Sequence, residues 1–177
     1  MKSLFKISVI ALLVMSGGLV FGQVPADVGV TATVSSPISI GTITPAAIDV
    51  VNAGEAGTLD PQGSAHSASL TGTPTAGHFQ ITGGFNGASV LIAYGTPATL
   101  SDGGANTFTF TGALSHMATT GASQASSADI ATSNAITMAE ATHEIWVGGS
   151  FSAVPNPGSY DTGSAGGTPL AVTLTLQ

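Results

Sequence analysis

Positively charged side chains are almost missing from this chain of 177 residues: Lys2 and Lys6 are its only lysines, and it has no arginine. Nucleic acids, phosphate ligands and anionic membrane surfaces are usually bound by Lys and Arg, so we expect none of them as a partner. Schiff-base lysines, arginine clamps on phosphoryl groups and lysine isopeptide crosslinks need the same missing nitrogens. The composition therefore predicts a class of function and no particular reaction.

Cysteine is also absent, which excludes a disulfide framework and thiolate metal sites. Charged residues make up only 6% of the chain, and all nine Asp and Glu residues lie beyond residue 22, whereas both lysines precede it. The part after residue 22 thus has nine negative and no positive side chains, a net charge of −9 with histidines neutral. Any partner must be bound without cations from this chain.

The N-terminus has the organisation of a secretory signal peptide. Lys2 and Lys6 form a short basic region, an apolar run follows over residues 7–15, and Val20 and Gly22 fit the small-residue rule before a cleavage site. We expect residues 1–22 to be removed and the protein to be exported to the periplasm, the cell surface or the extracellular space. No segment approaches the ~20 apolar residues of a membrane-spanning helix, so no membrane insertion is expected.

Residues 23–177 predict one domain rich in strands. Apolar and polar residues alternate in many short runs, separated by Gly, Pro and Asn. In residues 107–111, the alternation places Phe108 and Phe110 on one face and three threonines on the other. Many short strands with turns between them predict an all-β fold, an antiparallel β-sandwich. Residues 112–134 are mostly Ala, Ser, Thr and Gly, and we expect a long polar surface excursion there.

The first and last predicted strands, residues 28–34 and 170–177, carry no charged side chain. Exposed edge strands are normally protected by charge, above all by lysine, because their free N–H and C=O groups attract other strands. Such a chain must cover its edges internally or pair them with a neighbour by β-strand addition. Residues 24–36 are the best candidate for the added strand. Its inward face would consist of Val28, Val30, Ala32 and Val34.

The order of several short motifs resembles a known family. The motifs are ATVSSPISI (32–40), GTLDPQGS (57–64), HFQITG (78–83), EIWVGGSF (144–151) and PGSYDTG (157–163). This order is similar to that of the small exported bacterial proteins grouped as domain of unknown function 4402, whose members look like immunoglobulin-like sandwiches related to fimbrial subunits. The resemblance implies an immunoglobulin-like antiparallel β-sandwich and supplies no catalytic residues. This chain differs in the spacing from Tyr160 to Gly163 and in ending on Leu176 and Gln177 instead of an aromatic strand.

Residues 161–164 (Asp-Thr-Gly-Ser) match the short signature of aspartic proteases, in which two carboxylates share one proton. The chain has no second copy, although a homodimer could supply one, and a turn-forming stretch precedes the motif instead of an apolar strand. We interpret Asp161 as part of a polar turn. Because no Gly-x-Ser-x-Gly elbow occurs either, we predict no catalytic residues and a protein that is not an enzyme.

The four histidines show no local spacing typical of a metal site. They are His66, His78, His116 and His143. None forms an i, i+2 or i, i+4 pair, and Glu144 would point to the opposite face of a strand from its neighbour His143. We interpret the histidines as scattered surface or half-buried residues and predict no histidine metal site.

Calcium is the ion that fits the sequence best. Asp60 and Asp102, the latter followed by Asn106, place oxygen atoms in tight turns of an acidic exported protein. Asp before Pro or Gly is also an ordinary turn former. Single carboxylates fall short of the roughly 6 to 8 oxygens that calcium prefers. We predict no cofactor and keep these three residues as calcium candidates.

Trp146 is the only tryptophan, and it lies out of phase with the apolar residues Ile145 and Val147. An exposed indole would offer a flat contact to a surface glycan or a neighbouring subunit, whereas an indole under a loop would extend the core. The sequence leaves both open. We predict an exported structural subunit that pairs strands with itself or with related subunits into a fimbria-like or matrix-like assembly. The alternative is a monomeric adhesin or carbohydrate-binding module.

Overall fold

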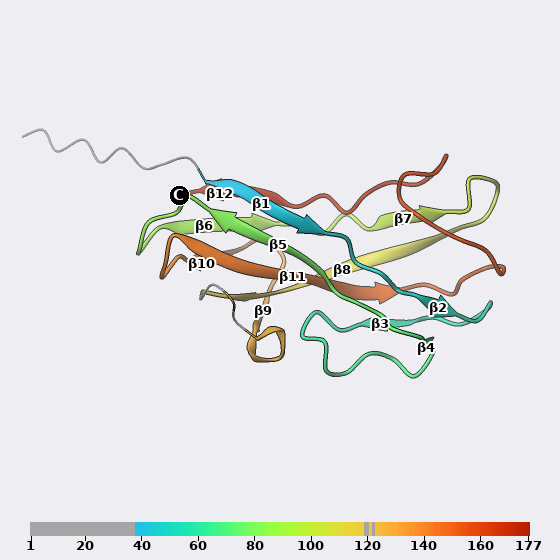
Figure 1. Cartoon of the computed structure of the whole chain (residues 1–177). Coiled ribbons are helices and arrows are strands. Elements are labelled where there is room, and N and C mark those ends of the chain that lie inside the picture. The colour runs from blue at the N-terminus through green and yellow to red at the C-terminus, as the bar shows by residue number, and fades with distance from the viewer. Residues whose placement is uncertain (1–37, 119–120, 122) are drawn as a thin grey trace, which may run out of the picture. The chain divides into compact units, whose positions relative to one another are not determined.

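The computed structural model describes residues 38–118, 121 and 123–177, which form a fold of strands (Figure 1). The predicted signal peptide and the predicted assembly residues Val28, Val30, Ala32 and Val34 lie outside the described residues. Within the described part there is no α-helix, only a 3-10 turn, η1, at Gln124–Ser126. The same residues accordingly include no helix with the length and hydrophobicity to cross a membrane.

The strands are short, apart from two central ones. The first six are β1 (Ser39–Thr44), β2 (Val50–Val51), β3 (Gly57–Leu59), β4 (Leu70–Thr71), β5 (Gly77–Thr82) and β6 (Ser89–Ala93). The rest are β7 (Ala98–Ser101), β8 (Thr107–Met117), β9 (Ala128–Ile130), β10 (Asn134–Thr137), β11 (Thr142–Phe151) and β12 (Thr173–Leu176).

The larger sheet is antiparallel and is built around β11. Its order is β1-β5-β11-β8-β7, and β3 also pairs with β11 and β9 with β8. The smaller sheet has the order β10-β6-β12, and β2 and β4 form a separate pair. In the described residues, β1 and β7 are therefore the outer strands of the larger sheet, and β10 and β12 those of the smaller one.

The core consists of two clusters, the first between the larger and the smaller sheet and the second between the larger sheet and the region of β2 and β4. The first joins Phe79, Ile81, Leu114, Ile130 and Ile145 of the larger sheet to Ala88, Val90, Ile92, Ile136 and Met138 on or beside the smaller one. The second contains Leu59, Leu70, Ala98, Phe108, Phe110, Phe151 and Val154. These antiparallel sheets, packed face to face, confirm the predicted all-β sandwich. The immunoglobulin-like topology stays a prediction.

The alternation predicted for residues 107–111 is confirmed. Phe108 and Phe110 are buried, and Thr107, Thr109 and Thr111 are exposed. Both phenylalanines enter the second core cluster, because side chains two residues apart on a strand share a face.

The predicted surface excursion over residues 112–134 is wrong in extent. Residues 112–117 continue β8 and pair with β11, and Leu114 and Ser115 are buried. Ala128–Ile130 form β9 on the other side of β8. The small residues that suggested a loop allow close packing instead. At Gly112, for example, an added Cβ would collide with the side chain of Leu170, which packs against this glycine. Among the described residues of this range, the connection around η1 and the turn at 131–133 lie outside the strands.

Candidate functional site

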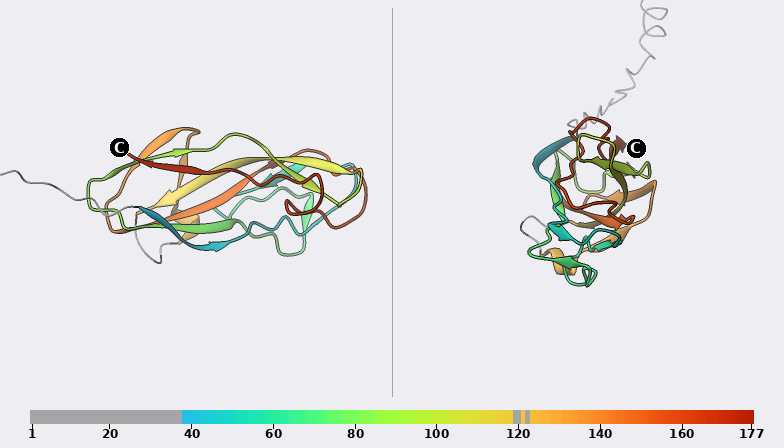
Figure 2. Two further views of the ribbon diagram at one scale, coloured as in Figure 1. Left: turned by 90° about the horizontal axis from the view of Figure 1, so that it is seen from above. Right: turned by 90° about the vertical axis from the view of Figure 1, so that its right-hand side faces the viewer.

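An apolar groove of about 800 Å³ opens between β1, an outer strand of the larger sheet, and the C-terminal segment that leads to β12. One wall is β1 with the residues that follow it to Val51, and the other is the C-terminal segment, with Tyr160 and residues 169–172. In the left view of Figure 2, blue β1 and the red C-terminal segment run on opposite sides of the yellow and orange β8 and β11. Packed interiors contain few voids larger than a water molecule, so the sandwich is not closed here.

The floor of the groove is part of the core. It includes the side chains of Phe79, Phe108, Phe110 and Val147. Among the described residues of the lining, Asp49 is the only charged one. His78 also borders the groove, but its imidazole lies on the opposite face of the sheet, beside Glu144. The groove is thus suited to an uncharged, apolar occupant.

Two isoleucines of β1 face the inside of the sandwich but are not covered. Ile40 lies opposite Ile81 and Ile43 opposite Phe79 in the antiparallel pairing, and opposed residues share a face. Ile81 and Phe79 are core residues, yet Ile40 is 46% and Ile43 68% exposed. Within residues 38–118, 121 and 123–177, no layer of side chains covers these two core-facing residues.

The outer strands differ in how their free edges are covered. Beside β7, backbone N–H and C=O groups of Thr99 exchange hydrogen bonds with Thr168, and those of Ser101 with Asp161. The C-terminal segment therefore covers β7. No described residue pairs with the outer edge of β1 or of β12. The edge of β1 borders the groove, whereas the lining on the other side ends at Val172, before β12 begins.

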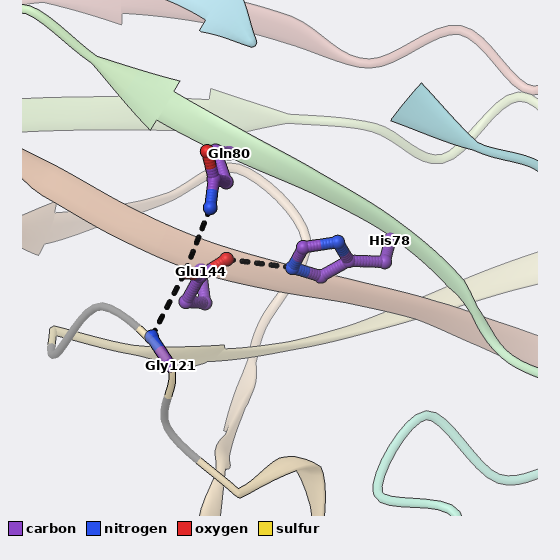
Figure 3. Close-up of polar contacts among 4 residues, drawn as sticks. All are labelled: His78, Gln80, Gly121 and Glu144. Atoms are coloured by element: carbon purple, nitrogen blue, oxygen red, sulfur yellow. Dashed lines mark hydrogen bonds and ion pairs between the residues drawn. The ribbon is translucent and has the colours of Figure 1, made fainter. Parts of the chain in front are cut away.

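The opposite face of the larger sheet carries a buried polar network (Figure 3). Glu144 is 3% exposed; its Oε2 lies 2.6 Å from Nε2 of His78, and its Oε1 accepts hydrogen bonds from Gln80 Nε2 (2.9 Å) and the backbone N–H of Gly121 (3.3 Å). A buried carboxylate is costly unless it is paired and hydrogen-bonded. Both oxygens of Glu144 are engaged, so the network fixes the connection before η1 to the sheet and leaves no oxygen free for a ligand.

Trp146 lies in this outer layer and is 7% exposed. Its ring packs against that of His78, with 5.5 Å between the centroids. The indole therefore has no open face for a glycan. Of the two interpretations left by the sequence, this burial agrees with an indole that extends the core.

Two histidines meet on the core side of the larger sheet. Nδ1 of His116 lies 2.7 Å from Nε2 of His143, and the rings stack with centroids 5.0 Å apart. His143 is 1% exposed, and its Nδ1 has no hydrogen-bond partner among the described residues. Burial, and to a smaller extent repulsion from His116, lowers the pKa of His143 to about 4, although the negative charge of Glu144 acts to raise it. Burial also lowers the pKa of His116.

The histidine contacts could not be found from local spacing. His116 and His143 are 27 positions apart, and His78 and Glu144 are 66 apart. Strand pairing brings them together. In residues 38–118, 121 and 123–177, no three His, Cys, Asp or Glu side chains gather closely enough to hold a metal ion. The predicted separation of His143 and Glu144 is confirmed, since one faces the core and the other the outer layer.

The calcium candidates hold their own turns. Asp60 accepts hydrogen bonds from the backbone of Gln62, Ser64 and Ala65. Burial raises the pKa of Asp60, but these hydrogen bonds outweigh it and the pKa is lowered. Asp102 accepts hydrogen bonds from the side chain of Asn106 and from backbone N–H groups. These bonds lower its pKa, and the bond from the Asn106 side chain has the largest effect.

Asp161 also holds a turn. It accepts hydrogen bonds from the hydroxyl of Ser164 and from the backbone N–H groups of Ser164 and Gly163, which lower its pKa. The carboxylate is exposed at the segment that covers β7. This geometry agrees with the polar turn expected from the sequence.

Comparison of the chain with family models, with curated proteins and with solved structures found no match. The similarity to domain of unknown function 4402 therefore stays a prediction.

Proposed function

We propose that this protein is an exported, non-enzymatic structural subunit of a bacterial surface assembly, joined to its own copies or to related subunits by β-strand addition. The apolar groove between β1 and the C-terminal segment that precedes β12 carries the proposal. An added strand would provide backbone hydrogen bonds to an unpaired edge and side chains to an uncovered part of the core. These are the two contributions that strand addition uses for affinity and specificity.

The uncovered isoleucines indicate how much such a strand would stabilise the fold. Complete burial of one isoleucine side chain contributes about 1.5–3 kcal/mol. With Ile40 at 46% and Ile43 at 68% exposure, covering both would contribute about 2–3 kcal/mol before any other lining residue is counted. Because the chain has no cations after Lys6, its copies repel one another electrostatically. Association must therefore rest on apolar contact and backbone pairing.

A charge placed in the groove tests the proposal. Ile43→Asp adds a carboxylate where an apolar strand would lie, and it should abolish assembly of the protein lacking residues 1–22 while the sandwich stays folded, since Ile43 is largely exposed. Thr107→Asp is the matched control, because it adds the same charge at an exposed strand position outside the groove lining.

Sedimentation velocity and electron microscopy read out assembly, and circular dichroism reads out folding. Equal assembly of Ile43→Asp and Thr107→Asp would contradict the proposal. A protein that remains monomeric at millimolar concentration without any substitution would contradict it too, and would leave the monomeric adhesin as the competing function.

A further inference from the structure

We propose that His116 and His143 form a pH-sensitive switch, in which uptake of one proton reverses the hydrogen bond between the two rings and leaves a buried N–H group without an acceptor. The switch is independent of the proposed assembly. It lies where β8 ends and β11 begins, since His116 is the last residue but one of β8 and His143 is the second residue of β11.

The two rings are joined by one hydrogen bond that can have either direction. Nδ1 of His116 lies 2.7 Å from Nε2 of His143, which is a hydrogen-bond distance. A neutral imidazole has one donor and one acceptor nitrogen, so one ring must donate and the other accept. The direction determines which nitrogen of His143 carries the hydrogen: Nε2 if His143 donates, and Nδ1 if it accepts.

Burial decides the direction while both rings are neutral. His143 is 1% exposed, and within the described part of the chain its Nδ1 is the one buried side-chain N or O atom without a hydrogen-bond partner. If His143 accepted, this atom would be an N–H group with no acceptor, and such orphaned donors are rarer in protein interiors than under-satisfied acceptors. In the neutral pair, His143 therefore donates through Nε2, and its Nδ1 is a bare acceptor.

Proton uptake reverses the bond. His116 is half-buried and His143 is fully buried, so a positive charge costs less on His116. A charged imidazole carries hydrogen on both nitrogens, so Nδ1 of His116 must then donate and Nε2 of His143 must accept. The shared proton passes from His143 to His116, and the proton taken up from water ends on Nδ1 of His143. That new N–H group has no acceptor in the core.

The surrounding strands offer this N–H group no carboxylate. On β5 and β11, His78 and Glu144 bind each other on the opposite face of the sheet (Figure 3). On β9, Asp129 is exposed, as is Glu140 in the turn before β11. The strands across the core, β6 and β10, contain no titratable residue. Within the described residues, Glu144 is the one carboxylate whose charge acts on His143, and burial of the imidazole outweighs it, since the pKa is lowered.

The switch acts on the ends of two paired strands. His116 lies opposite Ile145 of β11, and His143 lies opposite Ile81 of β5. A ring that turns to find an acceptor for its N–H group disturbs both pairings at this end. β3 and β7 pair with the other ends of β11 and β8. In mild acid, the strand ends at the two histidines should therefore rearrange while the region of β3 and β7 keeps its structure.

Nitrogen-15 NMR of the histidine side chains tests the switch, because protonated and bare imidazole nitrogens have different chemical shifts. Magic-angle-spinning spectra of sedimented protein suit both single and assembled copies, and correlations to the backbone assign each ring without any substitution. At pH 7.5, the hydrogen of His143 should be on Nε2. As the pH falls to 4, it should move to Nδ1 while His116 gains hydrogen on both nitrogens, and the two changes should share one midpoint.

Backbone signals of the same samples report the rearrangement. Those of residues 116–117 and 142–145 should shift with this midpoint, those of β3 and β7 should not, and the shift should be lost in His116→Phe, whose ring neither donates nor takes up a proton.

Three results would overturn the switch. The first is a hydrogen on Nδ1 of His143 already at pH 7.5. The second is a charge that appears on His143 while His116 stays neutral. The third is a reversal of the bond that leaves the backbone signals of residues 116–117 and 142–145 unchanged, because the strand ends would then not respond to the proton.

Discussion

Replacement of His143 by phenylalanine should make the sandwich less sensitive to mild acid. His143 is 1% exposed between the sheets, and the groups that act on it are the stacked ring of His116 on β8 and the neighbouring carboxylate of Glu144. The folded protein therefore holds this imidazole neutral. Protonation would place a charge inside an apolar cluster, next to a second histidine.

The size of the effect follows from the pKa. Burial and His116 lower the pKa of His143 from 6.5 to about 4, and one unit corresponds to about 1.4 kcal/mol. The unfolded chain takes up the proton near pH 6.5, while the folded protein resists it until about pH 4. The stabilisation is thus complete above pH 6.5 and is lost as the pH falls from 6.5 to 4, with a total of about 3 kcal/mol.

Urea unfolding at pH 7.5 and pH 4.8 measures this loss. The parent protein should lose about 2–3 kcal/mol of unfolding free energy between these pH values, and His143→Phe should lose at least 1 kcal/mol less. The pKa values of Asp60, Asp102 and Asp161 are lowered, so these carboxylates titrate below the window. An equal loss in both proteins would refute the assignment of acid sensitivity to His143.

Three further substitutions probe packing, the outer network and the contact between copies. Gly148→Ala should lower the free energy of unfolding by at least ~2 kcal/mol, because the added Cβ would collide with the backbone at Leu59 and Pro61. In the control Gly41→Ala, the added Cβ makes only ordinary contacts, so the melting temperature should stay unchanged. Glu144→Gln should release the backbone N–H of Gly121, visible as faster hydrogen exchange at that amide with the core amides unchanged. Phe85→Ser should leave the melting temperature within 2 °C, since Phe85 is 46% exposed. It should weaken assembly severalfold in sedimentation, because an exposed phenyl ring favours contact with another copy; unchanged assembly would contradict a contact through Phe85.

The local part of the fold could be predicted from the sequence because a strand repeats every two residues. The placement of Phe108 and Phe110 inside and of their threonine neighbours outside needs no knowledge of the rest of the chain. Residues 112–117 could not be assigned in this way. Their small side chains resemble a loop, and only pairing with β11 and contact with Leu170 make a strand of them.

The candidate site was predicted only in part. The lack of lysine at the edges indicated that some edge would be covered or used. The structure shows β7 covered by the C-terminal segment and β1 beside an open groove, and the use of that edge stays a prediction. The sequence does not reveal that Ile40 and Ile43 face inward without cover, because exposure depends on which strand lies opposite. The contact of His78 with Glu144 likewise depends on register between β5 and β11.

A cryo-electron microscopy map of the assembled protein lacking residues 1–22 tests the central claim most directly. The account predicts a continuous strand of density in each groove, contributed by an adjacent copy and lying beside β1. Assemblies in which the groove stays empty and copies touch elsewhere would contradict it.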